Sequence, residues 1–381
     1  ATIVNSGTAT GFGITSASFL PNAAPLIING DMQVAQRGTS TASITATGFY
    51  TCDRWKIEDS TDATLTNTQE SLTSGDAFAD GFSKSIKYDV TTADASLGAS
   101  QYAFLRYNFE GQDMQLFKKG SSTAETYTVS FWVKSTKTGT QILEFWDTTN
   151  SRTCCKSYTI DTTDTWEYKV LNYPADTTGA IANTNAGGMA LFFWLCAGSN
   201  YTGGTLSTTW TAYSDTNRAV GQVNNFDSTS NNFEITGVQL EVGEYTTADL
   251  PPFRHESYGD NLRRCERYYQ VIGSGTRADA RMYFPAFNFD GTSTMYGTYN
   301  MRVVMRTDTP SLDQESGTNY YKFDCNNAAD GFDGMNGIRG GRWGMSLYLS
   351  GGSSVGSSNA GMAGNVLGDD AASHIALDNE L

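Results

Sequence analysis

The segment Thr126–Ser135 alternates between apolar and mostly polar side chains, which is the pattern of a β-strand with one buried face. A pattern with a period of two cannot form the apolar stripe of a helix. The apolar face carries Tyr127, Val129, Phe131 and Val133, and the polar face carries Thr128, Ser130, Trp132 and Lys134.

Similar short runs recur along the chain, separated by clusters of Thr, Gly, Asp and Asn that are typical of turns. Aromatic residues make up 12% of the 381 residues, charged residues only 17%, and Gly occurs 39 times, which excludes a chain disordered over most of its length. No internal repeat is visible, which disfavours a propeller or solenoid. The sequence predicts an all-β chain with a jelly-roll β-sandwich. The expected strands lie near residues 26–28, 49–57, 126–135, 141–147, 165–171, 189–198 and 232–242.

A short helix is expected at Asp260–Tyr269, with Asp260 as its cap and an apolar stripe of Leu262, Cys265 and Tyr269. New strand patterns follow it and predict a second, smaller β domain. These boundaries divide the chain into an N-terminal arm (1–25), a jelly roll (26–252), a helical junction (253–269) and a C-terminal β domain (270–381). The Thr/Gly-rich arm is expected to be held by another chain or to be flexible.

The charge balance bears on the partners, because 25 basic and 40 acidic residues give a formal net charge of −15. Nucleic acid is not expected as a partner, since phosphate binding needs a basic surface. An anionic membrane is disfavoured for the same reason, and a neutral glycan or a protein fits better. The longest apolar run, Met189–Gly198, is too short to span a bilayer. No basic residue precedes Arg37, so we expect synthesis in a cytosol without a classical export signal.

The six cysteines show no metal-binding spacing, and with only two histidines a His-based zinc site is disfavoured. Their even number leaves disulfides open, but buried thiols are the preferred interpretation for a cytosolic chain.

One motif suggests hydrolase chemistry. Gly352–Gly356 matches G-x-S-x-G, with Ser354 as a nucleophile and Asp370 and His374 following in hydrolase order. The stretch is rich in Gly and Ser and lacks the strand and helix that a nucleophile elbow needs, so a loop is expected. An acidic and amide-rich segment, 324–336, lacks EF-hand spacing and is expected to be a solvated loop rather than a calcium site. We therefore expect no enzyme activity.

Trp132 is the strongest binding candidate, because an aromatic ring on a polar sheet face can stack on a sugar ring beside hydroxyl groups that bind the sugar's own. Trp146 and Trp210 are further glycan-binding candidates. The alternative is that another segment or subunit covers this face of the sandwich.

Four segments together resemble a family of bacteriophage tail-fibre and virion-appendage proteins that contain a carbohydrate-binding-module-like jelly roll. They are Leu26–Gly38 (LIINGDMQVAQRG), Tyr50–Trp55 (YTCDRW), Tyr127–Lys134 (YTVSFWVK) and Ile235–Gly243 (ITGVQLEVG). The segment Phe253–Tyr269 (FRHESYGDNLRRCERYY) is similar to the junction that follows this module in such proteins.

The resemblance implies a virion protein, a homotrimer that attaches to the host surface through a glycan or protein and docks onto other virion proteins through residues 1–25. The apolar stripe of the 260–269 helix could pack around the threefold axis. The resemblance also implies a structural Ca²⁺, for which Asn29, Asp31 and Glu241 are candidates by position. Two alternatives stay open, a glycan depolymerase tailspike and a purely structural capsid or tail decoration protein.

Overall fold

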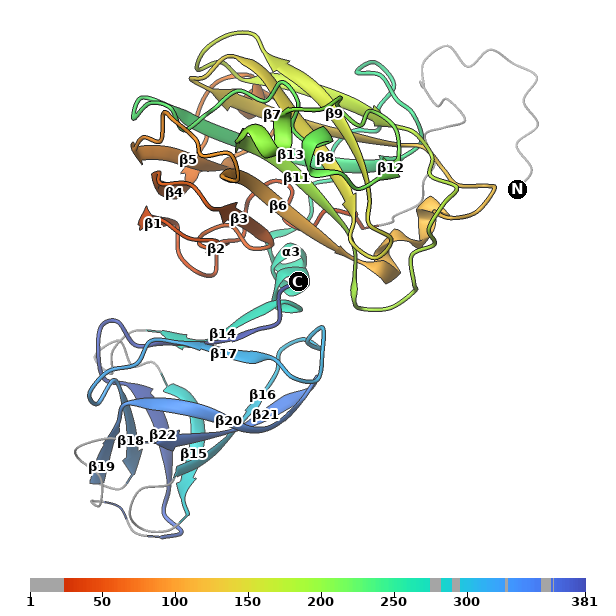
Figure 1. The fold of residues 1–381 in the computed structure, drawn as a ribbon. Coiled ribbons are helices and arrows are strands. Elements are labelled where there is room, and N and C mark those ends of the chain that lie inside the picture. The colour runs from red at the N-terminus through yellow and green to blue at the C-terminus, as the bar shows by residue number, and fades with distance from the viewer. Residues whose placement is uncertain (1–23, 275–281, 290–294, 326–327, 351–357, 359) are drawn as a thin grey trace.

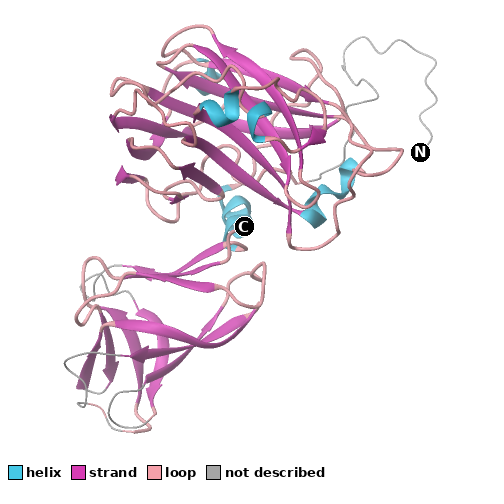
Figure 2. Cartoon of the chain, viewed as in Figure 1, coloured by secondary structure: helices cyan, strands magenta, loops and turns pink. Residues whose placement is uncertain are grey.

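The computed structural model describes residues 24–274, 282–289, 295–325, 328–350, 358 and 360–381. Strands are the main regular element of the described chain, and the helices are short (Figure 2). Two β-rich bodies meet at the helix α3, and the C-terminal end of the chain returns to this helix (Figure 1). This confirms the predicted all-β fold, with a jelly-roll sandwich, a short helix and a smaller second β domain.

The jelly roll consists of two antiparallel sheets. The first sheet has the order β1 (Ser40–Ile44), β4 (Thr64–Ser71), β5 (Lys84–Thr92), β13 (Asn232–Val242), β7 (Tyr127–Ser135) and β10 (Glu167–Tyr173). The second sheet has the order β12 (Thr211–Ala212), β9 (Arg152–Ile160), β8 (Gly139–Asp147), β11 (Gly187–Ala197), β6 (Tyr102–Glu110), β3 (Trp55–Asp59) and β2 (Gly48–Phe49). Four short helical turns lie in its loops, namely α1 (Asp76–Ala79), η1 (Gly111–Phe117), α2 (Ser199–Thr202) and η2 (Asp215–Asn217).

The core lies between these two sheets. The apolar face of β7 supplies Val129, Phe131 and Val133, each with 0% exposure, and they pack against residues such as Leu191 and Phe193 of β11. The predicted alternation along 126–135 is therefore confirmed. The run at 189–198 is buried on both faces, because a second apolar cluster covers the outside of β11.

One expected strand is absent. Leu26–Ile28 forms a bend that leads into a turn, and the backbone nitrogen of Ile28 donates to the hydroxyl of Tyr107 (2.8 Å) instead of to a strand. The turn rests directly on β13, since a Cβ on Gly30 would lie 2.3 Å from the carbonyl oxygen of Val238.

The C-terminal domain contains a three-stranded sheet in the order β14 (Tyr269–Ser274), β23 (His374–Asp378) and β17 (Ser311–Gln314). A seven-stranded sheet follows in the order β19 (Ala328–Phe332), β18 (Tyr321–Cys325), β22 (Ala363–Gly368), β15 (Met282–Asn288), β16 (Met295–Asn300), β21 (Gly344–Ser350) and β20 (Gly334–Gly341). A separate core, which includes Phe323, Leu347 and Val366, holds this domain together.

The helix α3 spans Tyr258–Glu266 and is capped by Ser257, whose side chain accepts from the nitrogen of Asp260. The expectation that Asp260 is the cap was wrong, because Asp260 lies three residues inside and its carboxylate accepts from the Ser257 hydroxyl (2.6 Å). Leu262 and Cys265 pack within the chain, in a cluster with Ile28, Val34 and Tyr268. The stripe is thus occupied internally and is not available to a threefold axis in this conformation.

All six cysteines are free and buried, which confirms the thiol interpretation. None of the helices in the described ranges is long and apolar enough to cross a bilayer.

Candidate functional site

The outward face of the first sheet, turned away from the core, is called the outer face here. Trp132 lies on it in β7, as predicted, and Tyr168 of the edge strand β10 is its register partner. The two ring centroids are 5.2 Å apart with planes inclined at 41°, and both side chains are partly exposed. The indole nitrogen of Trp132 donates to Asp80 (3.1 Å). A tethered, partly exposed pair of aromatic rings is therefore present at one edge of this face.

The segment 72–82, which contains α1, covers the middle of the outer face. Its residues Leu72, Ala77 and Phe82 form an apolar cluster with Trp166, and Trp132 and Phe253 pack against this cluster. The sequence left open that another segment covers the face that carries Trp132. The segment 72–82 does cover part of this face.

Gly237 makes this covering possible. It sits at a bulge of β13 with φ of +62°, and a Cβ at this position would lie 2.6 Å from the ring of Phe82. Only glycine combines this backbone conformation with so close a contact.

A groove of about 220 Å³ opens beside the covered region. The side chain of Lys134 lines it, with its ammonium group 2.9 Å from a carboxylate oxygen of Glu234 and 5.2 Å from the ring centroid of Trp166. The other oxygen of Glu234 accepts from Ser85 (2.5 Å). The groove is lined by Glu70, Ser71, Leu72, Thr73, Ser74, Lys87, Lys134, Trp166 and Glu234. Hydroxyl, ammonium and carboxylate groups beside a tryptophan can bind the hydroxyl groups of a sugar.

The other two tryptophan candidates do not lie near this face. Trp146 is on the outside of the second sheet, between Phe192 and Tyr213, with ring centroids 5.6 and 5.4 Å away. Trp210 belongs to the sandwich core, is 9% exposed, and donates to the carbonyl of Pro174 (3.0 Å). Of the three predicted residues, Trp132 alone has a position on the outer face.

The three calcium candidates have protein partners instead. The side-chain oxygen of Asn29 accepts from the nitrogen of Val34 (2.9 Å), and a carboxylate oxygen of Asp31 accepts from Asn261 (3.2 Å). Burial raises the pKa of Asp31. Both oxygens of Glu241 accept from Arg254 (3.2 and 3.1 Å), which puts a guanidinium where a metal ion would bind.

Calcium needs six to eight oxygen ligands. Here the side-chain oxygens of Asn29 and Asp31 face the amide of Asn261, and both carboxylate oxygens of Glu241 face Arg254. Within the part of the chain that the structure describes, no group of three or more His, Cys, Asp or Glu side chains could hold a metal ion. The three residues do not fit a calcium ion as they are arranged, so calcium stays a prediction without structural support.

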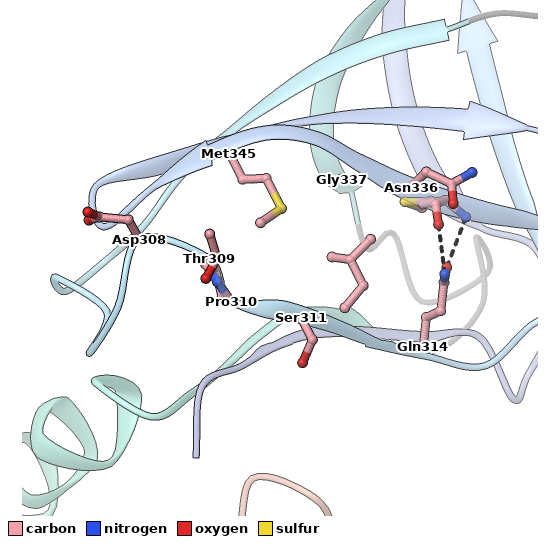
Figure 3. Close-up of a pocket in the computed structure, with 10 residues that line it drawn as sticks. Asp308, Thr309, Pro310, Ser311, Gln314, Asn336, Gly337 and Met345 are labelled. Carbon is pink, nitrogen blue, oxygen red and sulfur yellow. Dashed lines mark hydrogen bonds between the residues drawn. The ribbon is translucent and has the colours of Figure 1, made fainter. Parts of the chain in front are cut away.

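A second cavity, of about 420 Å³, lies in the C-terminal domain between β17 and the β20–β21 hairpin (Figure 3). Met335, Met345 and Leu312 supply apolar lining, and Gln314 bonds both the nitrogen and the carbonyl of Met335 (2.9 and 2.7 Å). Among its ten lining residues only Asp308 is ionisable, so two titratable groups do not meet there.

The suspected hydrolase residues are not assembled among the described residues. Ser354 lies outside them. One carboxylate oxygen of Asp370 accepts from the nitrogen of Ala372 (2.8 Å), within its own turn. The ring of His374 shares a hydrogen bond with the hydroxyl of Tyr269 (2.8 Å), and burial lowers its pKa.

Sequence reasoning missed Tyr168 and Trp166. Both lie in the run 165–171, which was expected to be a strand, and the pairing of that strand with β7 was not visible in the sequence. A signal was present, because Trp166 and Tyr168 are two positions apart and so could share one face of a strand.

No protein-family model matches this chain, and no curated protein is similar to it in sequence. Among solved structures, similarity extends to the enzymatically active domain of tailspike protein 4 from bacteriophage CBA120, with a TM-score of 0.29, 12% identity, and coverage of 57% of this chain and 21% of that one. A family 11 carbohydrate-binding module from Clostridium thermocellum matches with a TM-score of 0.27, 10% identity, and coverage of 55% and 98%. A fragment of endo-1,4-beta-D-xylanase 10B from the same organism matches with a TM-score of 0.27 and 12% identity, and the match covers 60% of this chain and 31% of that one. Similarities at this level are too weak to assign a family or a function.

Proposed function

We propose that this chain is a non-catalytic virion protein of a bacteriophage, a tail fibre or appendage, which attaches to the host surface by binding a glycan on the outer face of its jelly roll. The observation that carries the proposal is the Trp132–Tyr168 pair, two partly exposed rings on adjacent strands of a polar sheet face. Aromatic rings provide contact area for the apolar side of a sugar ring at a small cost in side-chain entropy.

The groove at Lys134 and Glu234 supports the same proposal, because it places hydrogen-bonding groups on the same face as the rings. Lys134 and Glu234 already form an ion pair, and Glu234 is 2% exposed, so this carboxylate is committed to structure rather than free to transfer a proton. Binding without bond cleavage is the chemistry that this arrangement favours.

The virion role rests on the sequence resemblance and extends beyond the site itself. In this proposal residues 1–25 dock onto other virion proteins and three chains associate. Three weak glycan sites on one trimer would raise the avidity by roughly 10²–10⁴ without a strong single contact. Sedimentation of the purified chain at micromolar concentration tests the trimer, and a mass of one subunit would count against it.

The site is tested by affinity electrophoresis in gels that contain purified bacterial surface polysaccharide. Wild-type protein should be retarded, and Trp132→Ala should lose most of the retardation. Trp146→Ala is a matched control, since Trp146 lies on the opposite sheet. Equal retardation of wild type and Trp132→Ala would contradict the proposed site.

A further inference from the structure

The C-terminal domain carries a row of exposed aromatic side chains that is separate from the outer face of the jelly roll. Phe287 of β15 is the register partner of Tyr296 of β16, which in turn is the partner of Tyr348 of β21. The row thus runs across three neighbouring strands. The ring centroids are 6.1 and 6.0 Å apart, and neighbouring planes lie within 32° of parallel. Phe289 joins the row, with its centroid 5.3 Å from that of Tyr296.

These rings point away from the core of their domain. Along β15 and β21 the alternate residues Phe284, Ala286, Leu347 and Leu349 are buried. Phe287 and Phe289 are 47% and 64% exposed, values that are high for large apolar side chains. The row therefore presents apolar surface to solvent that the fold itself does not need for its core.

Uncharged polar residues run beside the aromatic row. Thr298 of β16 pairs with Ser346 of β21, and Asn365 of β22 pairs with Pro285 of β15. All four side chains are at least partly exposed. Among the described residues, the outward-facing side chains of β15, β16 and β21 carry no charge. Hydroxyl and amide groups beside aromatic rings suit a ligand that is neutral and carries hydroxyl groups of its own.

The size of this strip decides between classes of partner. The register of the aromatic row continues to Ala363 of β22 and Asn336 of β20, so the whole row of residues crosses five strands and is about 19 Å long at the usual strand spacing. The aromatic row and the row of polar residues beside it lie about 7 Å apart, and together they cover an area on the order of 200 Å². A stable protein interface buries about 800 Å² on each partner, so this strip alone is too small for a second copy of the chain.

We propose that this strip, Phe287, Phe289, Tyr296 and Tyr348 with Thr298, Ser346 and Asn365, is a second binding site that takes a neutral oligosaccharide lying across the strands. The rings contact the apolar faces of the sugars, and the hydroxyl and amide groups beside them bind the sugar hydroxyls. The chain then carries two glycan sites on two separate domains.

The test uses the full chain in the background of Trp132→Ala, which removes the first site. Affinity electrophoresis is run against a panel of neutral polysaccharides, namely laminarin, xyloglucan, galactan and dextran. Trp132→Ala should still be retarded by at least one of them. Adding Tyr296→Ala and Tyr348→Ala should weaken that binding at least tenfold, and Phe289→Ala should weaken it to a smaller extent.

Trp343→Ala is the matched control, because Trp343 is 74% exposed in the turn between β20 and β21, about 17 Å along the strand from Tyr348. It should bind as its parent does. Unchanged circular dichroism would show that each variant is folded.

Three results would overturn the proposal. The first is no retardation of Trp132→Ala by any polysaccharide of the panel. The second is retardation that the Tyr296→Ala and Tyr348→Ala changes leave within twofold. The third is a loss of self-association in these variants with unchanged polysaccharide binding, which would identify the strip as a contact between copies. Because the first site is absent throughout, failure here leaves the proposed function at the outer face untouched.

Discussion

Arg54 of the jelly roll and Glu380 near the C-terminal end form an ion pair whose side chains are only 1% and 4% exposed. The guanidinium of Arg54 also stacks over Tyr268, 3.4 Å from its ring centroid, and donates to the carbonyl of Asn108 (2.7 Å). The chain thus leaves the second domain at the end of β23 and contacts the jelly roll again through Glu380. This contact fixes the two domains to each other.

We expect Glu380→Gln to lower the free energy of unfolding by about 3–5 kcal/mol, because Arg54 would remain buried without its counter-ion. Urea denaturation followed by circular dichroism measures this change. Glu125→Gln is the control, since Glu125 pairs with Lys118 on the surface, where the side chains are 38% and 52% exposed. That change should cost less than about 1 kcal/mol. Equal effects of the two substitutions would contradict the role of Glu380.

Gly237→Ala should destabilise the jelly roll by about 1–3 kcal/mol, because a Cβ would clash with the ring of Phe82 in a strained backbone conformation. The displaced 72–82 segment should also weaken polysaccharide binding at Trp132. Gly361→Ala is the comparison, with a φ of +82° and no atom within 4 Å of the added Cβ, so only backbone strain acts there. A Gly237→Ala protein as stable as Gly361→Ala would show that Phe82 is not held on β13.

Asp53 should make stability depend on pH. Burial raises its pKa to about 6 despite the opposing effects of Arg37 and Gln36. Between about pH 4 and pH 6 the folded state therefore holds a proton that the unfolded state has lost, so stability falls as the pH rises through this window. A shift of about two units corresponds to about 3 kcal/mol.

The measurement is the stability of wild type minus that of Asp53→Asn, at pH 7 and again at pH 4. This difference should move in favour of the wild type at pH 4 by up to about 3 kcal/mol. A difference that does not change with pH would mean that Asp53 does not titrate in this window.

The cysteines should react only after unfolding. Burial raises the pKa of Cys154 to about 12, and it raises the pKa of the other five thiols as well. Ellman's reagent should therefore label close to none of the six thiols in native protein and all six in guanidinium without reductant. Fewer than six in the unfolded, unreduced protein would indicate a disulfide.

The jelly-roll strands were largely predictable, because in a half-buried strand apolar residues that face the core alternate with residues that face outward, as in Tyr127–Ser135. The C-terminal strands were less so. Acidic and amide residues cluster at 324–336, so a solvated loop was expected there. In the structure Ala328–Phe332, which holds the fully buried Asp330, and the glycine-rich Gly334–Gly341 are strands instead. Pairing with neighbouring strands decided these elements, and sequence alone does not contain that information.

The junction shows the same limit at the level of side chains. Arg37 and Arg54 lie in two of the segments that carry the family resemblance, yet nothing in the sequence links them to Asp378 and Glu380 more than 300 positions away. The carboxylate of Glu110 likewise accepts hydrogen bonds from Arg267 (2.7 Å) and Tyr268 (2.6 Å) of the helical junction. The sequence did contain a signal that these residues have partners, because they lie near apolar residues and a buried charge needs a partner of opposite charge. It did not indicate which residues those partners are.

The proposed function requires that the chain bind a glycan without cutting it. The direct measurement is to incubate immobilised protein with bacterial surface polysaccharide and to record both the polysaccharide retained and the reducing ends released. We predict retention that Trp132→Ala diminishes, with no new reducing ends over time. Release of reducing ends that disappears when a carboxylate is substituted, or the absence of retention by the wild-type chain, would contradict the proposed function.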